Sequence, residues 1–473
     1  MIGHIIRKEI LENLLSWRFV LSLLLVICLF AASGFLFVST YRRQSHDYWS
    51  ETNKNLAGLS EQSKQLYKLA FYKQTVWRKP KPLTFCAGGF ERSLPDWFHF
   101  DLFVQSFPDV RSRSNFLLPR IVDMDWVFIV SLILSFVALL LAYDSVCGEK
   151  EDGTLCMMLA SSTPRYAVLL GKYVGAMITI GIPLLTGISV GIIIVVTSNV
   201  IVLTAHDWLC VSSIVLFSFL YVSVFVFLGI FVSTRVSHSA TSMVVLLFVW
   251  VGLVILIPSL GRLTSRVFSG RPGQLTLAKK LLDVDDNIIA DLRAGRFNRE
   301  AEAHPQANSP IKKHLRDTLW FNTWSDAKNR TIQEHHRQMI SQALAGRRFA
   351  CISPVIPFQR ASEIIAGTGI ERVMNLRDQI KRYQAGLKDY ILSKDKEDPN
   401  SLHLLVANVW RIEKWNAISK EAVRFDSVPK FQERNLALGQ SLKLAIWDIG
   451  LLILFNLVFF TAAFVSFLRY DVR

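Results

Sequence analysis

The sequence contains none of the short motifs that mark the common classes of enzyme. It has no glycine-rich loop ending in Lys-Ser or Lys-Thr, which excludes an ATP site of the P-loop type. It also has no His-Glu-x-x-His and no Cys-x-x-Cys. The letters of a nucleophile elbow occur at 187–191, but inside an apolar run and without the required strand–turn–helix context. We therefore predict that this chain is not an enzyme and that it binds no cofactor or metal of its own.

Cysteine is scarce, and its six copies show no metal-ligand spacing. Cys86 and Cys351 are the two that fall in long polar segments of the chain. If these segments face an oxidising compartment, a disulfide between them is permitted. Two unrelated thiols fit the same pattern, and the sequence leaves both readings open.

Ionisable residues are rare inside the apolar stretches. Asp144 and Asp448 lie at the ends of such stretches, and Asn456 is the clearest polar residue in the middle of one. An ion-coupled carrier usually places ionisable side chains near the middle of the membrane. If the protein drives uphill transport, we expect the energy to come from another chain.

Apolar residues make up 51% of the sequence and gather in six long stretches. Runs of roughly 20 apolar residues predict membrane-spanning helices, which satisfy their own backbone inside lipid. The first run is longer than the roughly 7–15 apolar residues of a signal peptide, so we expect it to be a retained helix. The expected fold is an all-α polytopic membrane protein whose six transmembrane helices lie at 19–38, 126–143, 168–196, 208–232, 240–258 and 444–468.

Two long polar segments separate these helices and define the expected domains. Residues 1–38 hold an amphipathic helix and the first membrane helix, 126–260 hold the next four, and 444–473 hold the last. Between them lie the insertions 39–125 and 261–443. We expect both insertions to be mainly helical and extracytoplasmic.

The positive-inside rule sets the expected orientation. Basic residues flank the first and last membrane helices, and this favours cytoplasmic termini in a multi-pass protein of the bacterial cytoplasmic (inner) membrane. Ile2–Trp17 has the pattern of an amphipathic helix on the membrane surface, although an extension of the first membrane helix is also open. The net charge of +15 lies largely in the second insertion, which fits a solvated surface or one that faces acidic lipid or cargo.

Inside the second insertion, apolar residues recur at helical spacing in four segments. These predict helices at 275–294, 311–344, 362–392 and 402–423. In the first insertion, an aromatic-rich segment at 85–118 is expected to form a small core or to lie against the membrane.

Glycines at four-residue spacing mark the third membrane helix. Gly171 and Gly175 form one pair, and Gly187 and Gly191 form a second. Small residues at this spacing allow two helix backbones to approach closely. We expect these glycines to be helix-packing positions.

A charged run interrupts the apolar sequence between the second and third membrane helices. It reads Glu149-Lys150-Glu151-Asp152-Gly153-Thr154 and continues toward Ala160 with a helical apolar side. We expect a short helix at 148–160. Thr163 and Pro164 then suit the N-cap and first position of the next helix.

This run, followed by Pro164-Arg165 and Leu170-Gly171-Lys172-Tyr173, resembles the signature of type-2 ABC transporter permeases. In that family the pattern is close to G-E-K-E-x-G-T, then P-x, then G-K-Y/F. The ending Leu468-Arg469-Tyr470-Asp471-Val472-Arg473 resembles a subgroup with large extracytoplasmic insertions. The resemblance covers the membrane helices well and the insertions only by position.

The resemblance implies the membrane subunit of an ABC exporter that works with a separate ATPase. The expected partners are two ATPase copies, which bind ATP and Mg, a second permease copy that completes a homodimer, and the lipid membrane. The implied ATPase-coupling helix contains Gly148, Glu149, Lys150, Glu151, Gly153, Thr154 and Leu155, and the N-terminal helix adds contacts at Arg7, Lys8 and Glu9. Glu149 and Glu151 are the expected docking contacts, although helix capping and solubility explain them equally.

Two further functions remain open at this stage. The insertions exceed what a simple pore needs, so the chain is also consistent with passing mechanical work to a periplasmic or cell-surface partner. A membrane-anchored scaffold without a motor is the third reading, and it leaves the coupling pattern unexplained. No nucleic-acid partner is expected.

Overall fold

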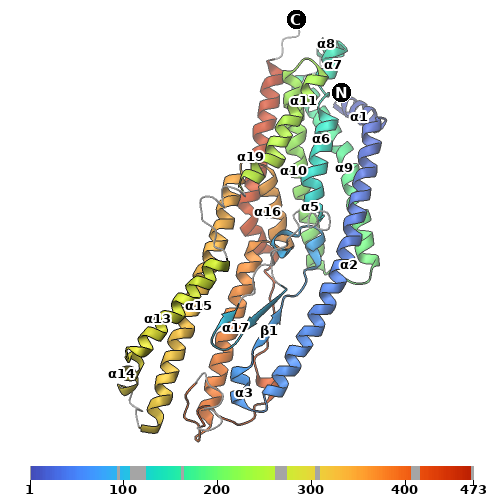
Figure 1. Cartoon of the computed structure of the whole chain (residues 1–473). Helices are drawn as coiled ribbons and strands as arrows, with labels where there is room; N and C mark the ends of the chain where they lie inside the picture. The colour runs from blue at the N-terminus through green and yellow to red at the C-terminus, as the bar shows by residue number, and fades with distance from the viewer. Residues whose placement is uncertain are drawn as a thin grey trace.

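The computed structural model describes residues 2–92, 96–106, 124–160, 164–261, 274–303, 309–405 and 416–469. The molecule is elongated, with a helix bundle at one end and the two insertions packed together at the other (Figure 1). Both chain termini lie at the far end of the bundle, which we call the terminal end. We call the opposite part of the molecule the insert region.

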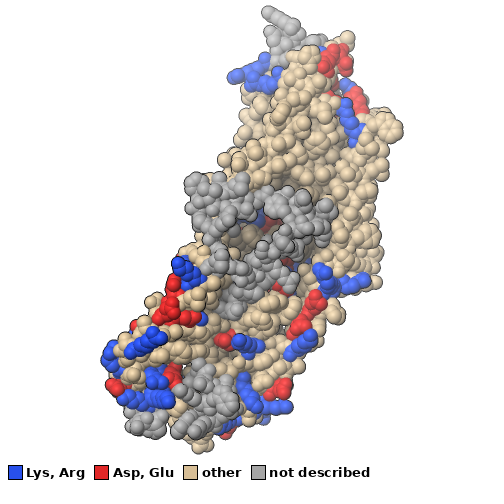
Figure 2. Space-filling model, in the orientation of Figure 1, with Lys and Arg blue, Asp and Glu red and all other residues tan. Residues whose placement is uncertain are grey.

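Six helices of the described residues are long and apolar enough to cross a membrane. This confirms the predicted all-α polytopic fold. On the face shown in Figure 2, an uncharged band separates charged groups at the terminal end from those of the insert region. The six candidate spans are Trp17–Gln62, Trp126–Glu151, Arg165–Thr197, Ala205–Arg235, Ser239–Gly261 and Leu438–Leu468.

These spans are built from helices with short π-helical stretches in two of them. The elements are α1 (Ile2–Leu14), α2 (Trp17–Gln62), α5 (Trp126–Phe128), the π-helix η3 (Ile129–Leu134), α6 (Ser135–Ala142), α9 (Arg165–Thr197), α10 (Ala205–Arg235), α11 (Ser239–Trp250), the π-helix η4 (Val251–Leu256) and α19 (Leu438–Leu468).

Helix α10 lies at the centre of the bundle and packs against α6, α9 and α19. Its buried Tyr221 donates a hydrogen bond to the Ser131 carbonyl over 2.8 Å and stacks on Phe358, with ring centroids 4.6 Å apart. The indole nitrogen of Trp250 donates to the Ser135 hydroxyl over 2.9 Å. Buried polar groups must find such partners where no water is available.

The insert region combines long helices with a small sheet. A three-stranded antiparallel sheet of order β1–β2–β3 packs its apolar side chains against α17. The elements are α3 (Leu66–Phe71), β1 (Gln74–Trp77), η1 (Pro82–Phe85), η2 (Gly89–Arg92), β2 (Trp97–Phe100), β3 (Gln105–Ser106), α13 (Gln274–Arg293), α14 (Arg296–Glu302), α15 (Ser309–Ala350), α16 (Val355–Ala366), α17 (Ile370–Glu397) and η5 (Phe425–Ser427).

Some expected element boundaries differ from the structure. The helix predicted over 362–392 is two helices, because Gly367 adopts φ +67° and ends α16 before α17 begins. Residues 402–405 and 416–423 are not helical, so the described ends of the fourth predicted helix contradict it. The sheet was not anticipated either, because its strands are too short to show a clear alternation.

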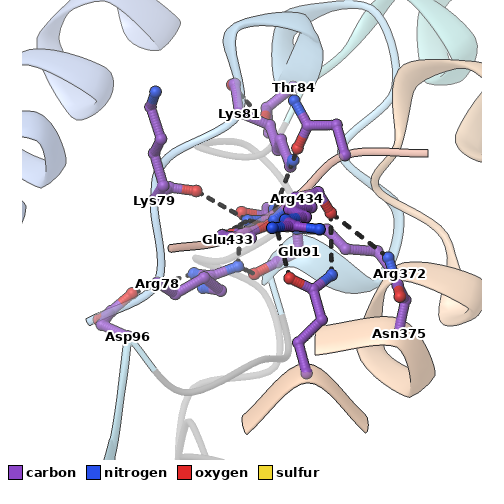
Figure 3. A network of polar contacts seen from close by, with 12 residues as sticks. Arg78, Lys79, Lys81, Thr84, Glu91, Asp96, Arg372, Asn375, Glu433 and Arg434 are labelled. Carbon is purple, nitrogen blue, oxygen red and sulfur yellow. Dashed lines mark hydrogen bonds and ion pairs between the residues drawn. The ribbon is translucent and has the colours of Figure 1, made fainter. Parts of the chain in front are cut away.

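A buried ion network connects the two insertions (Figure 3). Arg78 Nη1 lies 2.6 Å from Glu91 Oε1, and Arg372 of α17 bonds to both Glu91 and Glu433. Lys81 Nζ completes the network 3.2 Å from Glu433 Oε1. Burial and the neighbouring Arg372 lower the pKa of Lys81, although Glu433 partly offsets them. The network therefore joins three segments that are far apart in the sequence.

Candidate functional site at the terminal end

The charged run between the second and third membrane helices forms two short helices. Helix α7 (Cys147–Glu151) ends the second span, and α8 (Thr154–Ala160) follows it. Gly153 lies between them with φ +72°, a left-handed conformation that glycine adopts without strain. The single helix expected at 148–160 is therefore broken at Gly153.

Glu149 of α7 takes part in a chain of alternating charges. Lys172 Nζ of α9 lies 3.0 Å from Glu149 Oε1 and 2.6 Å from Glu9 Oε1 of α1. Lys8 Nζ, also on α1, approaches Glu149 Oε1 to 3.1 Å. Only 2% of the Lys172 side chain is exposed, so its charge depends on the two carboxylates for compensation.

Burial dominates the electrostatics of Glu9. It raises the pKa of this carboxyl group, and the charge of Lys172 only partly offsets the effect. Of the predicted N-terminal contacts, Glu9 is therefore an internal partner of α9, and Lys8 connects α1 to α7. Arg7 is exposed on α1.

Lys150 and Glu151 attach α7 to the turn between α10 and α11. Lys150 Nζ donates to the carbonyls of Thr234 over 2.6 Å and Val236 over 3.1 Å at the C-terminus of α10. Glu151 accepts hydrogen bonds from the backbone N–H and the hydroxyl of Ser239, the first residue of α11. These bonds satisfy end groups that helices leave without partners.

The two helices α7 and α8 differ in what they leave accessible. Glu149 and Glu151, the expected docking contacts, both bond within the chain. On α8, Leu155 is fully buried, whereas 79% of Met157 is exposed. Gly148 packs near Asp144 and Ser239, and the exposed Thr154 donates a hydrogen bond to the Glu149 carbonyl over 3.4 Å. Helix α7 is thus held by four neighbouring helices, and α8 projects from it.

The paired glycines of α9 lie at close approaches to other helices. A Cβ at Gly171 would meet Ile5 Cγ2 at 2.7 Å, and one at Gly175 would meet Glu9 Cβ at 2.7 Å. Gly187 lies against Phe30 of α2, and Gly191 lies near Trp126. Real Cβ atoms do not tolerate contacts below 3 Å, so the first pair sets how closely α1 approaches α9.

Replacing Gly175 with leucine is expected to displace α1, because the new side chain would overlap Glu9. Overpacking of this kind costs about 1–3 kcal/mol. Trypsin cleavage at Arg7 and Lys8 in the detergent-purified protein should become faster. The control is Gly450→Leu, because a Cβ at Gly450 of α19 meets nothing within 4 Å. Equal cleavage rates for both variants would contradict this packing role.

The sequence did not predict a role for three residues that make the polar contacts around α7. Lys172 was noticed only as a letter of a motif, although a lysine inside an apolar helix needs a buried counter-charge. Ser233, whose hydroxyl accepts from the Val146 and Cys147 amides, and Ser239 carried no sequence signal. The structure forms no disulfide between Cys86 and Cys351, because both are free cysteines.

Six apolar spans and a charged segment that is anchored at one end of them define a polytopic helical membrane protein. A family model described as "ABC-2 family transporter protein" matches residues 4–317, which is most of the chain. The protein belongs to this family. A second model, described as a domain of unknown function (DUF3526), matches residues 296–432 in the insert region.

Two curated relatives are similar over a short stretch. Both are named "Probable ABC transporter permease protein NosY". The protein of Stutzerimonas stutzeri is 39% identical over 59 residues, covering 12% of this chain and 21% of the relative. That of Pseudomonas aeruginosa is 37% identical over 59 residues, covering 12% and 22%. The chain thus spans about a fifth of the length of these relatives.

Proposed function

We propose that this chain is the membrane-spanning permease subunit of an ATP-driven exporter and that a separate ATPase docks on α8. The observation that supports this most directly is the attachment of α7. Its side chains bond to α1, α9, α10 and α11, so a push on α8 is passed to four helices of the bundle.

In this proposal the residues of the charged segment have separate tasks. Glu149, Lys150 and Glu151 hold α7 to the bundle rather than touching the ATPase. The left-handed Gly153 sets the angle between α7 and α8, and Met157 enters an apolar groove of the partner. Arg7 on the exposed side of α1 provides a second contact.

The proposal extends to the assembly and its orientation. Two permease copies pair with two ATPase copies, which bind ATP and Mg, and both termini lie in the cytoplasm of a bacterial cell. The terminal end then faces the compartment that holds the ATPase. The insert region lies on the other side, and the pore opens and closes between the two permease copies.

The sharpest test is co-purification with the ATP-binding-cassette protein encoded beside this chain. We expect the wild type to retain the ATPase in detergent and Met157→Asp to retain less than about a tenth of it, because a tenfold loss needs only about 1.4 kcal/mol. The control is Met374→Asp, which places the same change on an exposed methionine of the insert region. It should bind like the wild type.

Each other outcome has a defined meaning. If the wild type retains no ATPase, the motor-driven function is wrong and a scaffold becomes the better explanation. If Met157→Asp binds as well as the wild type, the partner stands but the docking surface is elsewhere.

A second function, mechanical transmission, is favoured by the way the insert region is built. Its two insertions are joined by the buried network around Arg372, and α16 packs into the bundle. A rigid body of this kind could deliver force to an extracytoplasmic partner. ATP-dependent substrate flux in vesicles supports export, whereas ATP hydrolysis without flux supports mechanical output.

A further inference from the structure

A cavity of about 70 Å³ lies where the bundle meets the insert region. Its walls come from η1, the start of α10, the junction of α16 and α17, and the segment that leads into α19. Both α10 and α19 begin there and run toward the terminal end (Figure 1). A buried water needs roughly 10–15 Å³, so the cavity has room for several non-hydrogen atoms. It is therefore large enough to hold a small organic group.

One wall of the cavity belongs to the ion network between the two insertions. Lys81, Arg372 and Glu433 line this wall, and Glu433 pairs with both cations (Figure 3). Arg372 also pairs with Glu91. The charges of these groups compensate one another and hold the two insertions together. The candidate binding groups are therefore the other polar side chains that line the cavity.

The inner part of the cavity holds acceptors that lack strong partners. The Glu371 side chain is 20% exposed, and its carboxylate lies 3.9 Å from Arg360 Nη2. The same arginine faces Asp448, with Nε 3.7 Å from Oδ2. Ser441 and Asp207 line the cavity too, and the Ser441 hydroxyl and Asp207 Oδ1 form no hydrogen bond with the described residues. Because two carboxylates share one arginine, negative charge is in excess beside the cavity.

The opening of the cavity presents donors instead. Arg434 lines it and is exposed, and its guanidinium forms no ion pair within the part of the chain that the structure describes. The neighbouring Asn435 accepts a hydrogen bond from Lys81 through Oδ1, which leaves its amide N–H groups to donate. Guanidinium and amide donors suit the oxygens of a phosphate or carboxylate. The cavity thus offers acceptors inside and donors at its opening.

This arrangement suits a zwitterion whose ammonium group enters first. A primary ammonium has three donors, which the carboxylate and hydroxyl oxygens of the inner part can accept. The described residues contain no group of three or more His, Cys, Asp or Glu side chains suited to a metal ion, so an organic cation fits better. Ile365 and Leu376 are buried side chains of the lining, and their apolar surface suits a short carbon linker.

We propose that this cavity binds an aminoalkyl phosphate, with the ammonium group on Glu371 and the phosphate on Arg434. The headgroup of an ethanolamine phospholipid and free phosphoethanolamine share this chemistry. The exposed Leu209 of α10 and Leu444 of α19 follow in the membrane part of the two helices and provide apolar surface for acyl chains. The proposal needs no ATPase and does not depend on the proposed function.

Thermal unfolding of the full-length protein in detergent tests the site. We expect phosphoethanolamine to raise the unfolding midpoint in a saturable way. Phosphocholine should leave it unchanged, because its methylated nitrogen has no N–H to donate. Glu371→Gln and Arg434→Gln should each weaken the binding about tenfold or more, since each removes a hydrogen bond to a charged group. The controls Glu397→Gln and Arg293→Gln remove the same charges from exposed positions of the insert region and should bind like the wild type.

A second arm distinguishes the two sources of the ligand. The protein is extracted from vesicles of phosphatidylethanolamine and phosphatidylcholine in equal amounts, and the retained lipid is identified by native mass spectrometry. Selective retention of phosphatidylethanolamine that is lost in Glu371→Gln and Arg434→Gln supports a lipid headgroup. A response to free phosphoethanolamine without such retention supports a soluble ligand.

Three results would overturn the proposal. The first is a wild type that neither retains phosphatidylethanolamine nor responds to phosphoethanolamine. The second is phosphocholine or phosphatidylcholine that binds as well as the ethanolamine form, because the ammonium donors would then have no role. The third is unchanged binding in both Glu371→Gln and Arg434→Gln, which would place the ligand elsewhere on the protein.

Discussion

Replacing Lys172 with methionine is expected to destabilise the terminal end and to weaken the binding of an ATPase that we propose there. The Lys172 ammonium lies between Glu9 and Glu149, and the methionine keeps the length of the side chain but removes its charge. Removing one partner of a buried ion pair costs about 3–5 kcal/mol, because the other charge stays buried without compensation. Glu9 loses its ion-pair partner in this variant, whereas Glu149 keeps its contact with Lys8.

The measurement combines the thermal unfolding midpoint in detergent with the fraction of ATPase that co-purifies. Both should fall in Lys172→Met. The double variant Glu9→Gln, Lys172→Met should recover much of the midpoint, because the buried carboxylate is removed together with its partner. Lys8→Met is the matched control: its side chain is 48% exposed, so solvent screening limits the loss to about 0–1 kcal/mol. A Lys172→Met variant that melts and binds like the wild type would contradict a mechanical role for this ion chain.

The sequence was sufficient for the membrane part of the fold because its signal is local. A helix that crosses a membrane shows itself by some 20 consecutive apolar residues, and no tertiary contact can change that requirement. The predicted spans accordingly lie inside the observed helices. Boundaries were less accurate where one residue decides them, as with Gly153 and Gly367, whose left-handed conformations end helices that the apolar pattern alone would continue.

The sequence predicted a short charged helical segment between the second and third spans, but it did not predict the contacts that its residues make within the chain. The sequence predicted Glu149 and Glu151 as docking contacts, with helix capping and solubility as the alternative, because no partner for them is visible nearby in the chain. Their partners, Lys172 and Ser239, are brought to them only by the packing of α9 and α11 against α7. Long-range ion pairs of this kind have no sequence periodicity, so only the structure assigns them.

The insert region depends even more on long-range contacts that the sequence does not reveal. Its joint depends on Arg372, which connects Glu91 and Glu433 although the three residues come from separate segments. The strands of its sheet are at most four residues long, too short for a period-two pattern to stand out. The packing of α16 (Val355–Ala366) against α10 and α19 was likewise hidden, since this apolar helix is too short to be recognised as a membrane segment.

Replacing Arg372 with methionine is expected to loosen the insert region as a whole. The Arg372 side chain is only 6% exposed and bonds to both Glu91 and Glu433, so its removal leaves each buried carboxylate with one cationic partner, Arg78 or Lys81. Burial already opposes ionisation of Glu433, and its pKa stays low only because Arg372 and Lys81 outweigh that effect. The loss should be about 1–3 kcal/mol for each carboxylate that loses its hydrogen bond to Arg372.

Thermal unfolding of the purified chain checks this, together with limited proteolysis of the insert region. Arg372→Met should melt earlier and be cut faster, whereas Lys394→Met, which removes an exposed pair with Glu397, should do neither. ATPase co-purification adds a second comparison, because the docking surface that we propose on α8 lies at the opposite end of the molecule from Arg372. If Arg372→Met still binds the ATPase but no longer exports or transmits force, the joint passes work from the bundle to the insert region. If its melting and cleavage match the wild type, the network is dispensable and the joint is held by apolar packing alone.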